Sequence, residues 1–599
     1  MVKRLVAIWF AIAVLFLASG ISAAACPIAS RTITVPAVVS DQEGGLLHIE
    51  AMVRPGNGMV YMGVDPLTGA STQMSAQMAA QEAFSGLNVS EQDCDVEFTI
   101  GDDGQSQSVD GPSAGLAMTV ALRAALTNAA LRDDVIITGA IRPGGQVGEV
   151  GGLIDKAQAS ARNGATILLT PRQQIYEGIL LRALAERYNF TAIEVQTLEQ
   201  AMAIASSRPG EEFNYTFEPK NRQVPQDLTA RSLNDDDRRF AQVAFKINDQ
   251  LKAQVDAGAT GALAPYQGYF SKEIAQNGQI IRMGYAYTGA NNAFLSQVEA
   301  DFLTTPPEKL DGNQELARID QCLSSLADVT PNENNLEWVA GAHARAAWTG
   351  QKVKDITENN QTYHSSEERY LAIRELYYAQ SWCEAASYLL DEARSIDGKP
   401  LNQSALAGVA AGSLQAAQDA MNRSQEPDAD ATWHLMIAND TLDGGDYLAS
   451  IYDATYARAV QESADEALGR NDSFLSNLSQ QLSGEEYSTL WGRTYQSQGA
   501  YIMADALANN RTAAGAYSIF RLARGMEAQM GGLKSTLANP PIRVQVGTGA
   551  SAADRSGANG AGEKIFGGSM RTADWVLGAI LVAGILALAV HAGRRLAPE

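Results

Sequence analysis

Short apolar runs of strand length alternate with longer runs of helical spacing between about residues 32 and 207. This alternation predicts an α/β (α+β) domain with some parallel strands. The expected strands cover residues 46–53, 96–100, 134–141, 165–170 and 191–196. The expected helices cover residues 113–126, 153–163 and 173–188, and residues 142–152 form a glycine-rich loop. The first third of the chain is therefore expected to be a mixed domain, with boundaries at about residues 30 and 208.

The pattern becomes helical further along the chain. Prolines and a glycine within residues 209–235 indicate a linker, and residues 236–537 combine few prolines with apolar positions at helical spacing. The second region should therefore be an all-helical domain. Its aromatic residues Tyr377, Tyr378 and Trp382 are expected to pack between helices. Residues 538–573 are rich in Gly, Ala and Ser, which is typical of a flexible tether.

Both ends of the sequence are apolar. Residues 1–25 combine an early basic pair, an apolar run and a final alanine triplet, which predicts a signal peptide, with an uncleaved N-terminal anchor as the alternative. Residues 574–593 are apolar enough to predict a transmembrane helix. The arginine pair after it favours a cytoplasmic tail over residues 594–599. We therefore expect a single-pass protein of the cell membrane, with its main domains outside the cytoplasm.

Composition narrows the possible partners. The 599 residues carry a net charge of −23, which argues against nucleic acid, because phosphate binding needs clustered Lys and Arg. The four cysteines are Cys26, Cys94, Cys322 and Cys383. Pairing within each half of this set is the simplest expectation for an extracytoplasmic chain, although sequence alone leaves the connectivity open.

Lys156 stands out because it is the only lysine between positions 3 and 220, in a stretch that contains several arginines. Arginine keeps its proton at any usable pH, whereas a desolvated lysine can lose it. A lone lysine among arginines therefore suggests a position that needs a removable proton. The alternative is chance in a lysine-poor chain.

Ser113 is the candidate nucleophile. It lies in the segment DGPSAG, residues 110–115, directly before an apolar helix. Free backbone N–H groups and the dipole at a helix start favour negative charge, such as the oxyanion formed during acyl transfer. The small neighbours would let a peptide backbone approach. The alternative is an ordinary serine helix cap.

A serine hydroxyl needs a base. His48 is the only histidine before His343, and it lies in a strand pattern that favours a structural role. Lys156 is the better candidate, because the start of its helix and the apolar neighbours Leu153 and Ala157 should lower its pKa. Asp155 is adjacent in sequence, but adjacent helical residues point in different directions, so it need not pair with Lys156.

These residues resemble the proteolytic domain of the Lon protease family over about residues 35–206. DGPSAG carries that family's nucleophilic serine, and the later GGL-x-x-K carries its catalytic lysine, at a similar spacing. The resemblance implies a Ser113–Lys156 dyad. It also implies that Thr138, in a matching Thr-Gly pair, hydrogen-bonds Lys156. The supporting residues of the serine segment are Asp110, Gly111, Pro112 and Ala114.

Several positions depart from the family pattern. Ala140 replaces a common glutamate after the Thr-Gly pair, and Ser108-Val109 replaces a common Pro-Lys pair. Ile154 replaces the first of two lysines, which removes ambiguity about the acting lysine. The phosphate-binding pattern GxxxxGK[ST] of an ATP-driven motor is missing from the sequence. No HExxH or Cys/His cluster indicates a metal, so neither ATP nor any other cofactor is expected.

The sequence thus predicts an ATP-independent serine endopeptidase that cleaves unfolded or flexible proteins or peptides outside the cytoplasm. The family resemblance implies a homo-oligomer, possibly a hexameric ring. Two alternatives stay open: an inactive cell-surface binding or scaffold protein, and a protein that cleaves its own chain once.

Overall fold

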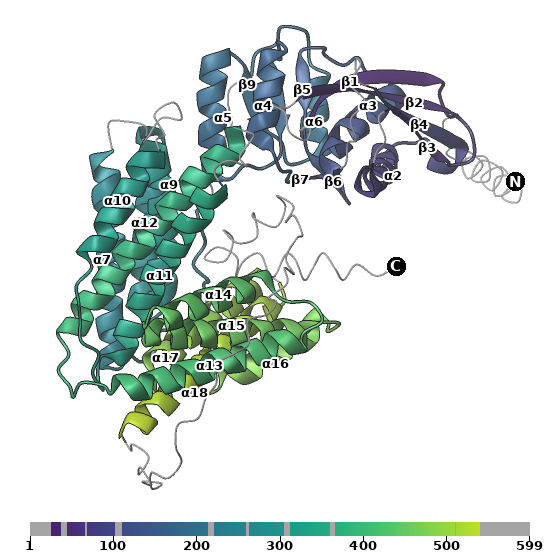
Figure 1. Ribbon diagram of the computed structural model, residues 1–599. Helices are drawn as coiled ribbons and strands as arrows, with labels where there is room; N and C mark the ends of the chain where they lie inside the picture. The colour runs from purple at the N-terminus through teal and green to yellow at the C-terminus, as the bar shows by residue number, and fades with distance from the viewer. Residues whose placement is uncertain are drawn as a thin grey trace, which may run out of the picture. The chain divides into compact units, whose positions relative to one another are not determined.

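The computed structural model describes residues 25–37, 45–65, 69–101, 111–213, 221–258, 263–304, 312–359, 366–509 and 511–538. The chain divides into two compact units. The first comprises Met1–Pro219 and Gln361–Leu371, and the second comprises Lys220–Asn360 and Ala372–Glu599. Figure 1 shows strands in the first unit and helices throughout the second.

The first sheet of the first unit has the order β1-β2-β4-β3. Its strands are β1 (Ala29–Ala37), β2 (Gly45–Pro55), β3 (Val60–Asp65) and β4 (Cys94–Gly101). β1–β2 and β2–β4 are antiparallel pairs, whereas β3 and β4 are parallel. In β2, Leu47, Ile49, Ala51 and Val53 are buried at alternate positions, as expected for a sheet with one face in the core.

The second sheet consists of three parallel strands in the order β5-β8-β9. They are β5 (Val135–Ile137), β8 (Ile167–Thr170) and β9 (Thr191–Glu194). β5 and β8 are buried at every position, as is typical of parallel strands covered on both faces. The helices of this unit are α2 (Ala70–Phe84), α3 (Gly115–Thr127), α4 (Leu153–Arg162), α5 (Ile175–Tyr188) and α6 (Leu198–Ala205).

The mixed α/β prediction for the first unit is confirmed, but two of the expected elements differ and four others were not predicted. The strand expected over residues 134–141 is broken into β5 and β6 (Ala140–Arg142). The break occurs because the Gly139 backbone pairs with the Ser113 segment instead of a neighbouring strand. The expected loop at 142–152 contains β7 (Gln146–Gly148), which forms a hairpin with β6. The sequence did not predict β1, β3, α2 and α6.

The second unit is helical, as the periodicity predicted. Its helices are α7 (Asp235–Ala257), α8 (Gln267–Arg282), α9 (Ala286–Thr304), α10 (Gly312–Ser325), α11 (Leu336–Asn359), α12 (Ser366–Arg394, in this unit from Ala372), α13 (Gln403–Arg423), α14 (Ala429–Asp443), α15 (Tyr447–Ala467), α16 (Asp472–Ser483), α17 (Leu490–Ala508) and α18 (Tyr517–Ala538). Tyr377, Tyr378 and Trp382 are buried, which confirms their packing role.

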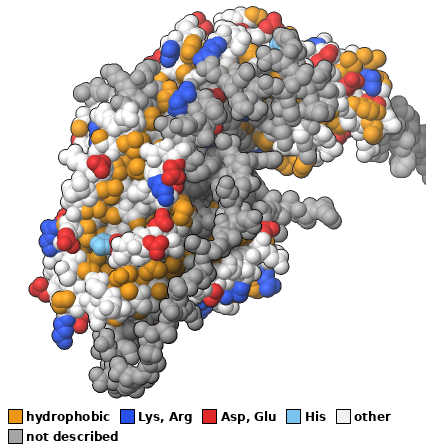
Figure 2. Space-filling view, in the orientation of Figure 1, with side chains coloured by type: hydrophobic (Ala, Val, Ile, Leu, Met, Phe, Trp, Pro, Cys, Tyr) orange, Lys and Arg blue, Asp and Glu red, His pale blue; other side chains and the backbone are white. Residues whose placement is uncertain are grey.

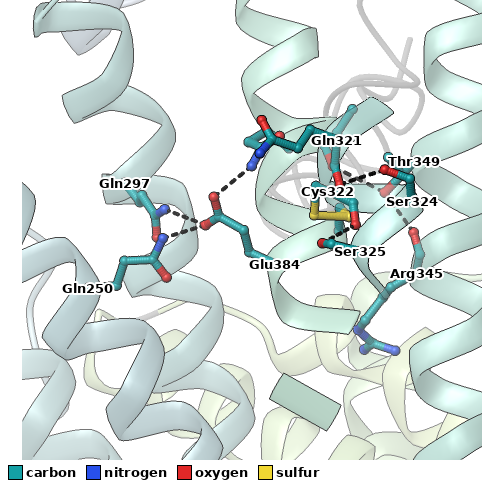
Figure 3. Close-up of a disulfide and its surroundings, with 12 residues drawn as sticks. Gln250, Gln297, Gln321, Cys322, Ser324, Ser325, Arg345, Thr349 and Glu384 are labelled. Carbon is teal, nitrogen blue, oxygen red and sulfur yellow. Dashed lines mark hydrogen bonds between the residues drawn. A yellow bond between two sulfur atoms is a disulfide. The ribbon is translucent and has the colours of Figure 1, made fainter. Parts of the chain in front are cut away.

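Two disulfides join the four cysteines, one between the first two and one between the last two, which confirms the expected pairing. Cys26 pairs with Cys94, so the segment before β1 is tied to β4. Cys322 pairs with Cys383 and ties α10 to α12 (Figure 3). Next to that second bridge, the Glu384 carboxylate accepts hydrogen bonds from two glutamine side chains of other helices.

Figure 2 shows Lys and Arg side chains scattered over the described residues of the visible face, without a basic patch. Within the ranges that the structure describes, no helix is both long and apolar enough to cross a membrane. The segments predicted as signal peptide, tether, transmembrane helix and tail (1–25 and 538–599) lie, but for their innermost residues, outside the described ranges.

Candidate active site

Ser113 lies in a single turn of 3₁₀ helix (Pro112–Ala114) that leads into α3. The Gly139 N–H donates to the Ser113 carbonyl oxygen at 2.9 Å, and the Leu116 N–H donates to the Gly139 carbonyl oxygen at 3.0 Å. These two bonds fix the serine turn against the break between β5 and β6. A Cβ atom at Gly139 would lie 3.0 Å from Val147, so a residue without a side chain suits this close approach.

Helix α2 holds the other side of the serine turn. The Gly111 N–H donates to Thr72 Oγ1 at 3.2 Å, and the Ser75 hydroxyl donates to the Pro112 carbonyl oxygen at 3.3 Å. Neither hydroxyl residue was singled out from the sequence. Their spacing, three residues apart on one helical face, is the only local signal that could have suggested a shared partner.

Gly115 is required by the packing behind the turn. A Cβ atom there would lie 2.5 Å from Ser75 Oγ and 3.1 Å from the Ile141 backbone nitrogen. Such separations are too short for ordinary contacts. The glycine after the serine therefore allows α2, the serine turn and β6 to meet. Asp110, the first residue of the predicted motif, lies outside the described residues.

Lys156 lies in the first turn of α4 and is 5% exposed. Burial lowers the pKa of its amine to about 8, and the negative charge of Glu367 opposes that shift. The apolar neighbours Leu153 and Ala157 are almost fully buried, so the desolvation expected from sequence is confirmed. A base with a pKa near 8 is partly deprotonated at neutral pH, which an ordinary lysine is not.

The hydrogen bond expected between Thr138 and Lys156 is not formed. Lys156 Nζ instead donates to the Gly151 carbonyl oxygen at 2.7 Å. Thr138 Oγ1 is buried and has no hydrogen-bond partner among the described residues. Over the same residues, no hydrogen bond joins Lys156 Nζ to Ser113 Oγ. The sequence could not indicate this arrangement, because the competing acceptor for the Lys156 amine is a backbone carbonyl, that of Gly151, which every residue type carries.

Thr138 is nevertheless next to a residue that is hydrogen-bonded to the serine turn. It directly precedes Gly139, which is hydrogen-bonded to Ser113, and its own N–H donates to the Leu169 carbonyl oxygen at 3.0 Å. An unpaired buried hydroxyl costs about 1–3 kcal/mol. A hydrogen-bond partner for Thr138 Oγ1 would therefore stabilise the site.

Asp155, which was expected to point away from Lys156, contacts a distant segment. Its Oδ1 accepts a hydrogen bond at 3.3 Å from the backbone N–H of Glu367, in the first turn of α12. The Glu367 carboxylate in turn accepts from the Ile154 N–H at 2.5 Å. Residues 361–371 belong to the first unit, so these contacts lie within it. Glu367 was missed from the sequence because it follows α4 by some two hundred positions.

The remaining candidates are accounted for by the fold. His48 lies on the exposed face of β2 and hydrogen-bonds Thr34 on β1 at 3.1 Å, in keeping with its strand position. The glycine-rich turn of the β6–β7 hairpin is held by Glu82 on α2. The Glu82 carboxylate accepts from the N–H groups of Gly144 and Gly145 at 3.1 and 2.8 Å.

Comparison with known proteins supports the same assignment for this unit. Residues 37–203 match the model of the Lon protease (S16) C-terminal proteolytic domain. The Lon protease of Haemophilus influenzae is 32% identical over 126 residues, covering 20% of this chain and 15% of that protein. The archaeal Lon protease of Thermococcus kodakarensis is 28% identical over 174 residues, covering 28% of this chain and 26% of that protein.

A third relative, the Lon protease of Xanthomonas oryzae pv. oryzae, is 30% identical over 173 residues, or 28% of this chain and 20% of that protein. The chain thus spans about a quarter or less of the length of these three relatives. The residues that match the family model, 37–203, lie within the first unit, so the similarity to the Lon proteolytic domain concerns that unit.

Proposed function

We propose that the chain is an ATP-independent serine endopeptidase in which Ser113 is the nucleophile and Lys156 the general base. The observation that carries this proposal is the buried Lys156 amine, whose pKa is lowered to about 8 in a Lon-type proteolytic domain. A neutral amine can take the proton from a serine hydroxyl, which an arginine could not do.

The proposed reaction proceeds through an acyl-enzyme. Lys156 Nζ removes the Ser113 hydroxyl proton as Oγ attacks the scissile carbonyl carbon. Backbone N–H groups of the serine turn stabilise the oxyanion. The Lys156 ammonium then protonates the leaving amine as the C–N bond breaks. A water molecule, deprotonated by Lys156, then attacks the ester carbonyl carbon, and the Lys156 ammonium gives that proton to Ser113 Oγ as the C–O bond breaks.

The reaction requires the Lys156 amine to leave the Gly151 carbonyl oxygen. Thr138 Oγ1 is the natural new partner, because it is a buried hydroxyl without one. Thr138 directly precedes Gly139, whose backbone is hydrogen-bonded to Ser113 and Leu116. We therefore propose that the described state is a resting arrangement, and that an active one forms when Nζ moves toward Thr138 and Ser113.

The substrates in this proposal are unfolded or flexible proteins and peptides, because the sequence provides no motor to unfold a compact one. We further propose that the chain acts outside the cytoplasm, held by its C-terminal apolar segment and assembled as a homo-oligomeric ring. Pairing of all four cysteines supports the location, since disulfides persist in oxidising compartments.

The test uses Ser113→Ala and Lys156→Arg in the full chain, with Ser85→Ala as the matched control. Ser85 is an exposed serine of the same unit whose hydroxyl has no hydrogen bond among the described residues. Cleavage of unfolded casein should be lost in the first two variants and kept in the control, with or without ATP. Undiminished cleavage by Ser113→Ala or Lys156→Arg would refute the proposal.

A further inference from the structure

The N-termini of α4 and α12 exchange helix caps within the first unit. The N-cap residue of α4, Gly152, has no side chain, so its first turn has no local side-chain cap. Glu367 of α12 replaces it by accepting the Ile154 N–H at 2.5 Å. Asp155 of α4 reciprocates by accepting the Glu367 N–H at 3.3 Å. Lys156 follows directly after these two capped positions.

This exchange buries two carboxylates beside the amine. Asp155 is 5% exposed and Glu367 is 8% exposed. Taking a carboxylate out of water costs several kcal/mol, which a helix dipole and one hydrogen bond only partly offset. Simple capping needs no charge, since Ser, Thr or Asn serve as well. A buried carboxylate is therefore a costly cap where a neutral side chain would serve.

The charge of Glu367 acts on Lys156. Glu367 is the neighbouring charge that raises the pKa of the Lys156 amine against the effect of burial. On Glu367 itself, burial and the charge of Asp155 raise the pKa to about 7, against the opposing effects of the Ile154 N–H and of Lys156. Glu367 and Lys156 titrate as a coupled pair, because each lies in the field of the other.

We propose that Glu367 is a positioning residue for the Ser113–Lys156 reaction: it fixes the turn that carries Lys156, and its carboxylate sets the proton affinity of the Lys156 amine. The inference rests on the proposed function. Ionised Glu367 favours the ammonium form, which donates to the Gly151 carbonyl oxygen in the resting arrangement. Loss of that negative charge makes the amine easier to deprotonate and leaves it free to move toward Ser113.

Two substitutions separate the cap from the charge. Glu367→Gln keeps a side-chain oxygen for the Ile154 N–H and removes the charge, whereas Glu367→Ala removes both. Glu186→Gln is the control, because Glu186 is a surface carboxylate of α5 paired with Arg182 in the same unit. All are made in the full chain. Circular dichroism verifies folding, and kcat/KM on unfolded casein is measured from about pH 6 to about pH 9.5.

In Glu367→Gln, the acidic limb of the kcat/KM profile should move to lower pH by about one unit, with the plateau kept. Glu367→Ala should show the same shift with a lower plateau, so that Gln rescues the plateau relative to Ala. Glu186→Gln should match the parent. If the acidic limb of the kcat/KM profile lies at the same pH in Glu367→Gln as in Glu186→Gln, the inference is overturned.

A second readout keeps the test decisive if turnover is weak. The rate at which a serine-reactive phosphonate labels Ser113 should show the same pH shift in Glu367→Gln. An unchanged labelling profile in folded Glu367→Gln would refute the role of Glu367. Ser113→Ala separates the two proposals: if it cleaves normally, the proposed function fails. If it is inactive while Glu367→Gln is unshifted, only the inference about Glu367 fails.

Discussion

The serine turn and the first turn of α4 are supported in contrasting ways. Backbone groups of Ser113 and Leu116 bond directly to Gly139, and two hydroxyls of α2 hold the residues just before the serine. The turn of α4 instead relies on a buried carboxylate from residue 367. Its functional amine is bonded to a local carbonyl rather than to the partner that it would need for catalysis.

The difference suggests that the nucleophile is held rigidly while the base is adjustable. Backbone hydrogen bonds are insensitive to pH, so the Ser113 position should not change on titration. The α4 turn combines a carboxyl with a pKa of about 7 and an amine with a pKa of about 8, so its charge changes near neutral pH. Variants in the two regions should therefore fail differently.

The largest effect is expected from Gly115→Val, which attacks the rigid region. Its side chain would meet Ser75 Oγ and the Ile141 backbone, so the serine turn must shift. Overpacking of this kind costs about 1–3 kcal/mol of stability. Misplacing the nucleophile should lower kcat on the order of 100-fold. Thermal melting and casein cleavage measure the two effects.

Gly101→Val is the control for this substitution, because a Cβ atom at Gly101 meets nothing within 4 Å. Its activity should stay near that of the parent. A Gly115→Val activity as high as that of Gly101→Val would show that the serine turn tolerates displacement and is not the rigid partner.

The pH dependence tests the adjustable region in the parent chain. Only neutral Lys156 can accept a proton, so kcat/KM should rise about tenfold per pH unit and level off above about pH 8. The same depressed pKa affects stability. Because the unfolded lysine keeps its proton up to its higher ordinary pKa, the contribution of Lys156 to stability should increase as the pH rises between the two values.

Urea unfolding at several pH values measures that contribution, with Lys156→Met as the reference that lacks the titrating group. The difference in unfolding free energy between parent and variant should grow from pH 8 upward. A kcat/KM profile that is flat from pH 6 to about pH 9 would contradict the role of Lys156 as base.

Thr138→Val should have a moderate and diagnostic effect. Valine has nearly the same shape and removes a buried hydroxyl that has no partner, so the melting temperature should stay the same or rise. If the hydroxyl receives the Lys156 amine in the active arrangement, kcat should fall roughly tenfold, which corresponds to the loss of one ordinary hydrogen bond. Reduced stability with unchanged kcat would assign Thr138 to the core instead.

The sequence predicts most elements of the Lon-type domain, and it fails where long-range contacts decide. Residues 134–141 have the apolar composition of one strand, but the Gly139 backbone pairs with Ser113 and Leu116, which no local pattern encodes. The desolvation of Lys156 was predictable from Leu153 and Ala157 beside it. Glu367 was not, because its role depends on how a distant helix start reaches α4.

Glu82→Gln should give the smallest effect and tests whether the rigid region extends into the β6–β7 hairpin. The Glu82 carboxylate accepts from two adjacent backbone N–H groups, those of Gly144 and Gly145. A glutamine has one oxygen and would turn an N–H₂ group toward the second donor, which should cost about 1–3 kcal/mol. Because the hairpin directly follows Gly139 in the chain, its displacement should lower kcat only a few-fold. The acidic limb of the kcat/KM profile should stay in place, since Glu82 is not among the charges that act on Lys156. A shift of that limb would show that the two regions are coupled electrostatically and would contradict the division between a rigid nucleophile and an adjustable base.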